Sequence, residues 1–106
     1  MAVCAVTRHA EHRTRERVGI PKKAVRRAVA KAITEGIKRT EIEGGLRRYL
    51  DWLYWRGNGG ANNIVVYGDK VYLFNGDILI TVLTVPTAHA KQVARLMKKR
   101  RKDNEM

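Results

Sequence analysis

Histidines and arginines recur at helical spacing near the start of the chain, in "TRHAEHRTRERV". His9, Arg13 and Arg17 are four residues apart, so a helix would place them on one stripe, while His12 and Glu16 are spaced to pair beside it. Histidine is the natural general acid or base near neutral pH, and arginine can neutralise the charge that builds on phosphate during RNA cleavage. The stripe indicates either a metal-independent ribonuclease site or, as the plainer alternative, a solvated helix face with a structural His9.

A second group of polar and aromatic side chains lies in "YGDKVYLFNGDILITV" (residues 67–82), where the turn dipeptides "GD" and "NG" separate three strands. Strand alternation predicts one shared face for Tyr67, Lys70, Tyr72 and Thr81. Aromatic rings stack on bases for about 1–3 kcal/mol per base, and a nearby lysine can hold a phosphate. We expect a nucleic-acid surface here. Because Val65, Phe74 and Leu79 share the face, one alternative is a second core face beneath the C-terminal helix. The other is a mixed face, covered at one end and open at Tyr67, Lys70 and Thr81.

The residue types give little support to other chemistries. Cys4, His9, His12 and His89 match no structural zinc spacing, and "GNGG" precedes a strand and lacks the lysine of a phosphate-binding loop. Serine does not occur in the chain, which excludes a serine nucleophile. We therefore expect neither a metal nor a cofactor.

Positive charge is the strongest compositional feature. The 106 residues include 22 Lys and Arg against 10 Asp and Glu, a net charge of +12. This balance suits a phosphate backbone, although acidic proteins attract it too. We expect the charge to gather on one side of the molecule, as a nucleic-acid surface formed by Arg13, Arg17, Lys22, Lys23, Arg26, Arg27, Tyr67, Lys70, Tyr72, Lys98, Lys99, Arg100 and Arg101.

Four helices and a three-strand meander should position these groups. Thr7 is a suitable N-cap and Gly19 a suitable stop for the first helix, and Pro21 begins the second. The third helix, at 46–56, carries Trp52 and Trp55 on a second stripe beside its inner face, and the last helix covers about 87–102. The predicted fold is α+β, with N-terminal helices on one face of a three- or four-stranded antiparallel meander and a basic C-terminal helix. We expect one domain at 1–98 and a frayed basic tail at 99–106.

The turn dipeptides also predict the strand register. Taken as two-residue turns, they place Val66 opposite Val71 and Ile64 opposite Leu73. Across the next turn, Val71 should face Ile80 and Leu73 should face Ile78. The face formed in this way is wholly aliphatic, so it should pack on helices. A fourth strand is expected only if "AVCAV" (residues 2–6) supplies it.

Two stretches resemble known families. "TRHAEHRTRERVGIPKKAV" is similar to the His-x-x-x-Arg-x-x-x-Arg opening helix of small BrnT-like phage and bacterial domains, and "ANNIVVYGDKVYLFNGDILITVL" resembles a meander in uncharacterised proteins of phages and Gram-positive bacteria. The element order resembles the RelE-like and BrnT-like endoribonuclease toxins, whose fold is shared with barnase and colicin nucleases. The resemblance implies an active site on the open sheet face, with Tyr67, Lys70, Tyr72 and Thr81 joined by His9, Arg13 and Arg17.

Three function classes follow. The favoured one is a small nucleic-acid-binding protein of phage or mobile-element type, with RNA favoured over DNA as partner. The alternatives are a metal-independent endoribonuclease toxin and an anti-defence protein, similar to an anti-CRISPR, that docks on an acidic host protein or nucleoprotein complex. Because no apolar run is long enough for a bilayer and no secretory signal precedes the first helix, we expect a cytoplasmic protein without a membrane partner.

Overall fold

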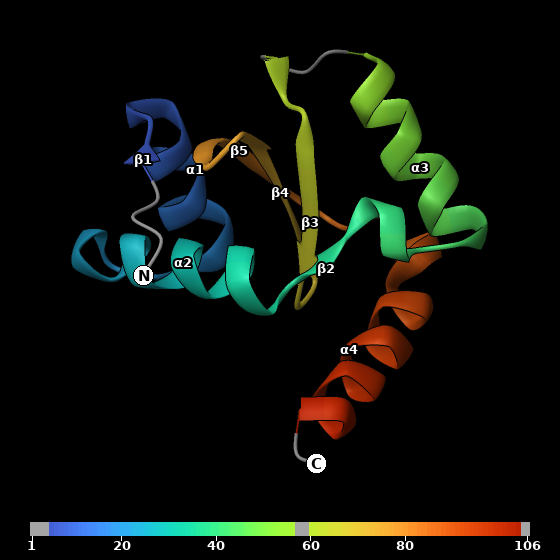
Figure 1. Cartoon of the computed structure of the whole chain (residues 1–106). Helices are drawn as coiled ribbons and strands as arrows, with labels where there is room; N and C mark the ends of the chain where they lie inside the picture. The colour runs from blue at the N-terminus through green and yellow to red at the C-terminus, as the bar shows by residue number, and fades with distance from the viewer. Residues whose placement is uncertain (1–4, 57–59, 105–106) are drawn as a thin grey trace.

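The protein has an α+β fold in which one sheet lies between two pairs of helices (Figure 1). The computed structural model describes residues 5–56 and 60–104, and the side chains at 5, 22 and 101–104 are left out of the description. The helices are α1 (Arg8–Val18), α2 (Val25–Glu35), α3 (Gly44–Trp55) and α4 (Ala90–Asn104). The strands are β1 (Ala5–Val6), β2 (Ile37–Lys38), β3 (Asn63–Tyr67), β4 (Lys70–Asn75) and β5 (Ile78–Thr84). Short 3-10 turns occupy Lys22–Ala24, Arg39–Glu41 and Thr87–His89.

The sheet has the strand order β1-β5-β4-β3-β2. Strands β2 to β5 form the antiparallel part, so the predicted meander is extended by β2. The segment "AVCAV" contributes only Ala5–Val6 within the described residues, and these pair in parallel with β5. The predicted fold class is confirmed.

The register between β3 and β4 is as predicted, whereas the register between β4 and β5 is not. Val71 pairs with Leu83, and Leu73 pairs with Thr81, with an irregularity next to Phe74. The two-residue turn is Gly76-Asp77, one position later than expected, and Gly76 has the positive φ of 61° that this turn requires. Its position is held from outside the hairpin, because the Gly76 amide donates to the Asn62 side chain at 2.8 Å.

Both faces of the sheet are buried, each by a different pair of helices (Figure 1). α3 and α4 cover the aliphatic face, with a core formed by Ile37, Ile42, Leu46, Leu50, Leu53, Ala61, Ile64, Val66, Val71, Leu73, Val85 and Val93. α1 and α2 cover the other face, with a core formed by Ala10, Val25, Val29, Ala32, Val65, Tyr72, Phe74, Leu79 and Val82. The expected open face is therefore wrong. The second-core alternative is correct, except that the N-terminal helices and not the C-terminal helix cover it.

The signals at the helix ends act as the sequence indicates. The Thr7 hydroxyl accepts the Ala10 amide hydrogen at 3.1 Å, and Gly19 ends α1 with φ +75°. α4 continues to Asn104, so the boundary expected at residue 98 falls inside a helix. Among the described helices, none combines the length and the apolar composition that crossing a bilayer requires.

Candidate nucleic-acid interface

The structure does not assemble the site predicted on the sheet. Tyr72 is 3% exposed beneath α1 and α2, and burial raises its pKa to about 12. The Tyr67 hydroxyl lies 3.4 Å from a Glu35 carboxylate oxygen, and the Lys70 ammonium is paired with its neighbour Asp69 at 3.1 Å. Thr81 pairs with Leu73, so the β-irregularity turns it to the face opposite Tyr72. The four residues therefore share no open surface.

The histidine and arginine stripe of α1 is held in structural contacts. The Arg17 guanidinium donates to the Val82 carbonyl of β5 at 2.6 Å, at the edge that β1 leaves uncovered. Arg13 lies 3.8 Å from Glu16, which also lies 3.2 Å from His12, as the spacing predicts. His9 is exposed and makes no hydrogen bond or ion pair with either arginine. The candidate catalytic groups His9, Arg13, Arg17, Tyr72 and Thr81 thus do not converge on one point.

The basic residues lie on both sides of the sheet, which overturns the expectation of a single positive side. On the α1 and α2 layer, the exposed ones without an acidic partner among the described residues are Arg8, Arg15, Lys23, Arg26, Arg27 and Lys31. On the α3 and α4 layer they are Arg48, Arg56, Lys91, Arg95, Lys98 and Lys99. The Arg100 guanidinium instead donates to the Gly36 carbonyl and pairs with Glu41. The side chains of Lys22 and Arg101 lie outside the described part of the chain.

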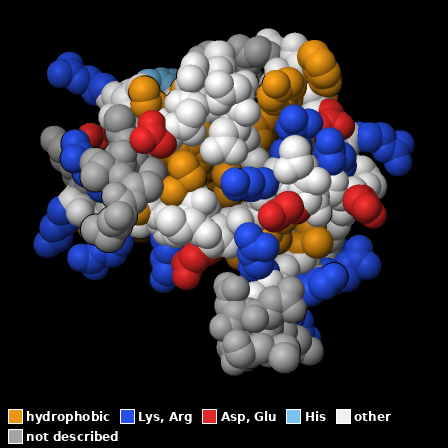
Figure 2. Space-filling view, in the orientation of Figure 1, with side chains coloured by type: hydrophobic (Ala, Val, Ile, Leu, Met, Phe, Trp, Pro, Cys, Tyr) orange, Lys and Arg blue, Asp and Glu red, His pale blue; other side chains and the backbone are white. Residues whose placement is uncertain are grey.

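Charge alone therefore does not single out one surface, but α3 differs from the other helices in its exposed aromatic residues. Trp52 is 51% exposed and Trp55 is 80% exposed, on the side of α3 that faces away from the sheet. Figure 2 shows hydrophobic and basic side chains gathered together over α3, at the upper right. The sequence places both tryptophans on one stripe, but a helix pattern does not distinguish an outer face from a second inner face. The sequence pattern therefore predicts no role for the two tryptophans.

The Tyr49 and Trp52 rings are stacked, whereas Trp55 meets its neighbouring ring edge-on. The Tyr49 and Trp52 rings are 6.2 Å apart at an interplanar angle of 27°, and the Arg56 guanidinium lies 4.5 Å from the centre of the Trp52 ring. The His89 ring lies 5.7 Å from Tyr49, on the side of α4. Trp55 meets the edge of Tyr54 at 5.4 Å. We call this surface the α3 platform; it comprises Arg48, Tyr49, Trp52, Trp55, Arg56 and His89.

The charges beside the α3 platform leave it positive. The one carboxylate on this helix, Asp51, receives hydrogen bonds from Arg47 and Arg39, and these bonds lower the pKa of Asp51. Its charge is thereby matched by two guanidinium groups. Arg39 also lies over the Tyr54 ring at 4.2 Å. Burial raises the pKa of Tyr49, which further favours the neutral phenol.

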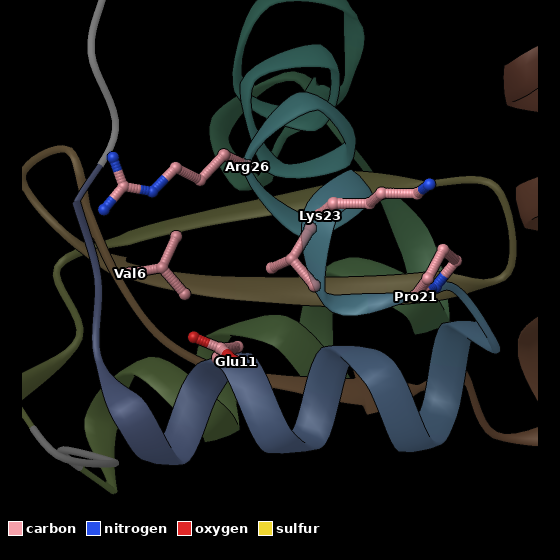
Figure 3. Close-up of a pocket in the computed structure, with 6 residues that line it drawn as sticks. Val6, Glu11, Pro21, Lys23 and Arg26 are labelled. Atoms are coloured by element: carbon pink, nitrogen blue, oxygen red, sulfur yellow. The ribbon is translucent and has the colours of Figure 1, made fainter.

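A separate cavity of about 630 Å³ lies between α1 and the start of α2 (Figure 3). Val6 and Val25 approach it from different elements, Glu11 rises from α1, and the side chains of Lys23 and Arg26 extend in opposite directions. The cavity is an apolar slot with charged groups at its border. No cluster that could hold a metal ion occurs among the described residues, and Cys4 lies outside them.

Comparison of the chain with known proteins gives no match: no protein-family model matches it, and neither a curated protein nor a solved structure does. The α3 platform is accordingly interpreted on its own geometry.

Proposed function

We propose that this protein binds single-stranded nucleic acid, with RNA favoured, by stacking bases on the α3 platform. The observation that carries the proposal is the setting of Trp52, which is half exposed and lies next to the Tyr49 ring and the Arg56 guanidinium. Unpaired bases of RNA are typically held on aromatic rings and on arginine planes. The α3 platform offers both, side by side.

The energetics support this use of the surface. Single exposed hydrophobic side chains are ordinary on proteins, but two neighbouring tryptophans among cations are not. An aromatic ring that stacks on a base stabilises a complex by about 1–3 kcal/mol, and every base has a face that can stack. Because stacking on an aromatic ring does not depend on the identity of the base, we expect binding with little sequence preference.

A second candidate function is docking on an acidic host protein through the same surface. Tryptophan, tyrosine and arginine are the residue types that contribute most to protein–protein binding, and the α3 platform contains all three. The two functions differ in their ligand. Saturable binding of an oligonucleotide by the isolated protein supports the first, and its absence together with capture of an acidic protein supports the second.

Replacement of Trp52 tests the proposal. Trp52→Ala should weaken the binding of a short RNA by about 1–3 kcal/mol, or roughly 5- to 150-fold, because one stacking surface is lost. Trp52→Phe should retain part of the affinity. The measurement is fluorescence anisotropy with a labelled single-stranded oligonucleotide at fixed salt.

Ile78→Ala is the matched control, because Ile78 is also a large exposed hydrophobic residue, at 41%, but lies on β5 away from the α3 platform. Its affinity should equal that of the wild type. Equal affinities for the wild type, Trp52→Ala and Ile78→Ala would contradict the proposal.

A further inference from the structure

The first turn of α4 is fixed against the beginning of α3. The Gln92 side chain accepts the Leu46 amide hydrogen at 3.2 Å and donates to the Glu43 carbonyl at 2.7 Å. On the preceding turn, His89 lies beside both Tyr49 and Gly45, and a Cβ at Gly45 would lie 3.4 Å from the His89 ring. The α3 platform and the surface of α4 therefore meet at this junction (Figure 1).

The outer side of α4 is a line of cations. Lys91, Arg95 and Lys99 are spaced four residues apart, so they share one face of the helix, and all three are exposed. None of them has an acidic partner among the described residues. We call this line the α4 basic stripe.

Two contacts fix the direction in which the α4 basic stripe points. Val93 is buried in the core beneath α3, with Leu96 and Met97 packed against it. Arg100 is tied to the Gly36 carbonyl at 3.1 Å and lies 3.6 Å from Glu41, at the edge of the sheet. With its inner side held in this way, the helix must present the α4 basic stripe to solvent.

We propose that the ligand is an extended single strand whose bases stack on the α3 platform while its phosphate backbone continues along the α4 basic stripe. This inference rests on the proposed function and adds the length and the path of the strand. At about 1.5 Å per residue, the 12 residues of α3 and the 15 residues of α4 span about 18 Å and 22 Å. A path of this size is comparable with sites that hold about 4–16 nucleotides.

Few carboxylates oppose this path. Asp51 is matched by two arginines and Glu41 by Arg100, which leaves the exposed Glu43 at the junction. The sequence of α4 contains no acidic residue before Asp103. A phosphate backbone that leaves the α3 platform at His89 would thus meet net positive charge along α4.

The experiment compares oligoadenylates of 4 and 12 nucleotides. Binding is measured by tryptophan fluorescence over a range of salt concentrations. For the wild type, the slope of log K against log salt should be steeper for the longer strand by about 2, because each of three further phosphates releases about 0.7 counterion. In a variant carrying Lys91→Gln, Arg95→Gln and Lys99→Gln, the extra slope and the extra affinity of the longer strand should disappear, with binding of the shorter strand unchanged.

The matched control removes three cations from the opposite side of the sheet, by Arg26→Gln, Arg27→Gln and Lys31→Gln. This control should bind both strands like the wild type. Equal losses of affinity for the longer strand in the two triple variants would overturn the inference in favour of a general charge effect. Unchanged affinity for the longer strand in both triple variants would overturn it as well. In both cases, quenching by the shorter strand would still uphold the proposed function, whereas failure of both strands to bind the wild type would overturn the two together.

Discussion

The surroundings of a single side chain decide its role, and Tyr72 is an example. The alternation of β4 and its pairing with β3 place Tyr72 on the same face as Lys70 and Tyr67, and the observed register agrees. The alternation does not predict that α1 and α2 cover this face. Trp52 is the converse case, because it lies on a helix with an apolar inner face and yet points to solvent.

Tyr72 allows a prediction about pH. Burial raises its pKa to about 12, so the folded state favours the neutral phenol. The resulting stabilisation is fully present below the usual pKa of about 10 and is lost as the pH rises towards 12. An absorbance titration of the wild type against Tyr72→Phe should show one phenol that ionises near pH 12 in the folded protein. Ionisation of that phenol near pH 10 would contradict its burial, and RNA affinity should be equal in both proteins at pH 7.

At the scale of elements, the edge of β5 depends on α1. Within the described part of the chain, β1 pairs with residues 78 and 79 of β5, and beyond this point the Arg17 guanidinium donates to the Val82 carbonyl. Arg17, which the sequence indicated as a phosphate-binding residue, therefore provides a hydrogen-bond donor at the edge of the sheet. A charged donor on a carbonyl is worth about 1.5–3 kcal/mol, more than a neutral hydrogen bond.

Replacement of Arg17 should consequently lower stability. We expect Arg17→Met to reduce the free energy of unfolding by about 1.5–3 kcal/mol, because the Val82 carbonyl loses its donor while the aliphatic packing is kept. Arg15→Met, on the exposed side of the same helix, should change it by less than about 0.5 kcal/mol. Urea unfolding followed by circular dichroism measures both, and equal stabilities of the two variants would contradict this role of Arg17.

Local signals predicted the elements well, and distant contacts decided the rest. Thr7, Gly19 and the β3–β4 turn act through neighbours in the sequence, so the first helix and the Val66–Val71 pairing could be predicted. The β4–β5 register depends on Asn62, which is remote in sequence from the turn that it holds. The site predicted on the sheet was wrong for the same reason, because the exposure of its side chains depends on how the helices pack on the sheet.

At the scale of the whole molecule, the exposed basic residues lie in two helix layers, on opposite sides of the sheet. Composition gives the total of +12 but not this division. Only one of the two layers combines exposed tryptophans with cations, because α1 and α2 contain no aromatic residue. Nucleic-acid binding through the α3 platform thus predicts a directional contact, with the α3 and α4 side towards the strand.

The chain contains its own probe for this contact, because its two tryptophans are both on the α3 platform. Titration of the wild-type protein with single-stranded RNA should quench the tryptophan emission in a saturable manner, since stacked bases contact the indole rings directly. The affinity from quenching should equal that from anisotropy of the labelled strand. RNA binding that is seen by anisotropy but leaves the tryptophan emission unchanged would contradict the assignment of the α3 platform.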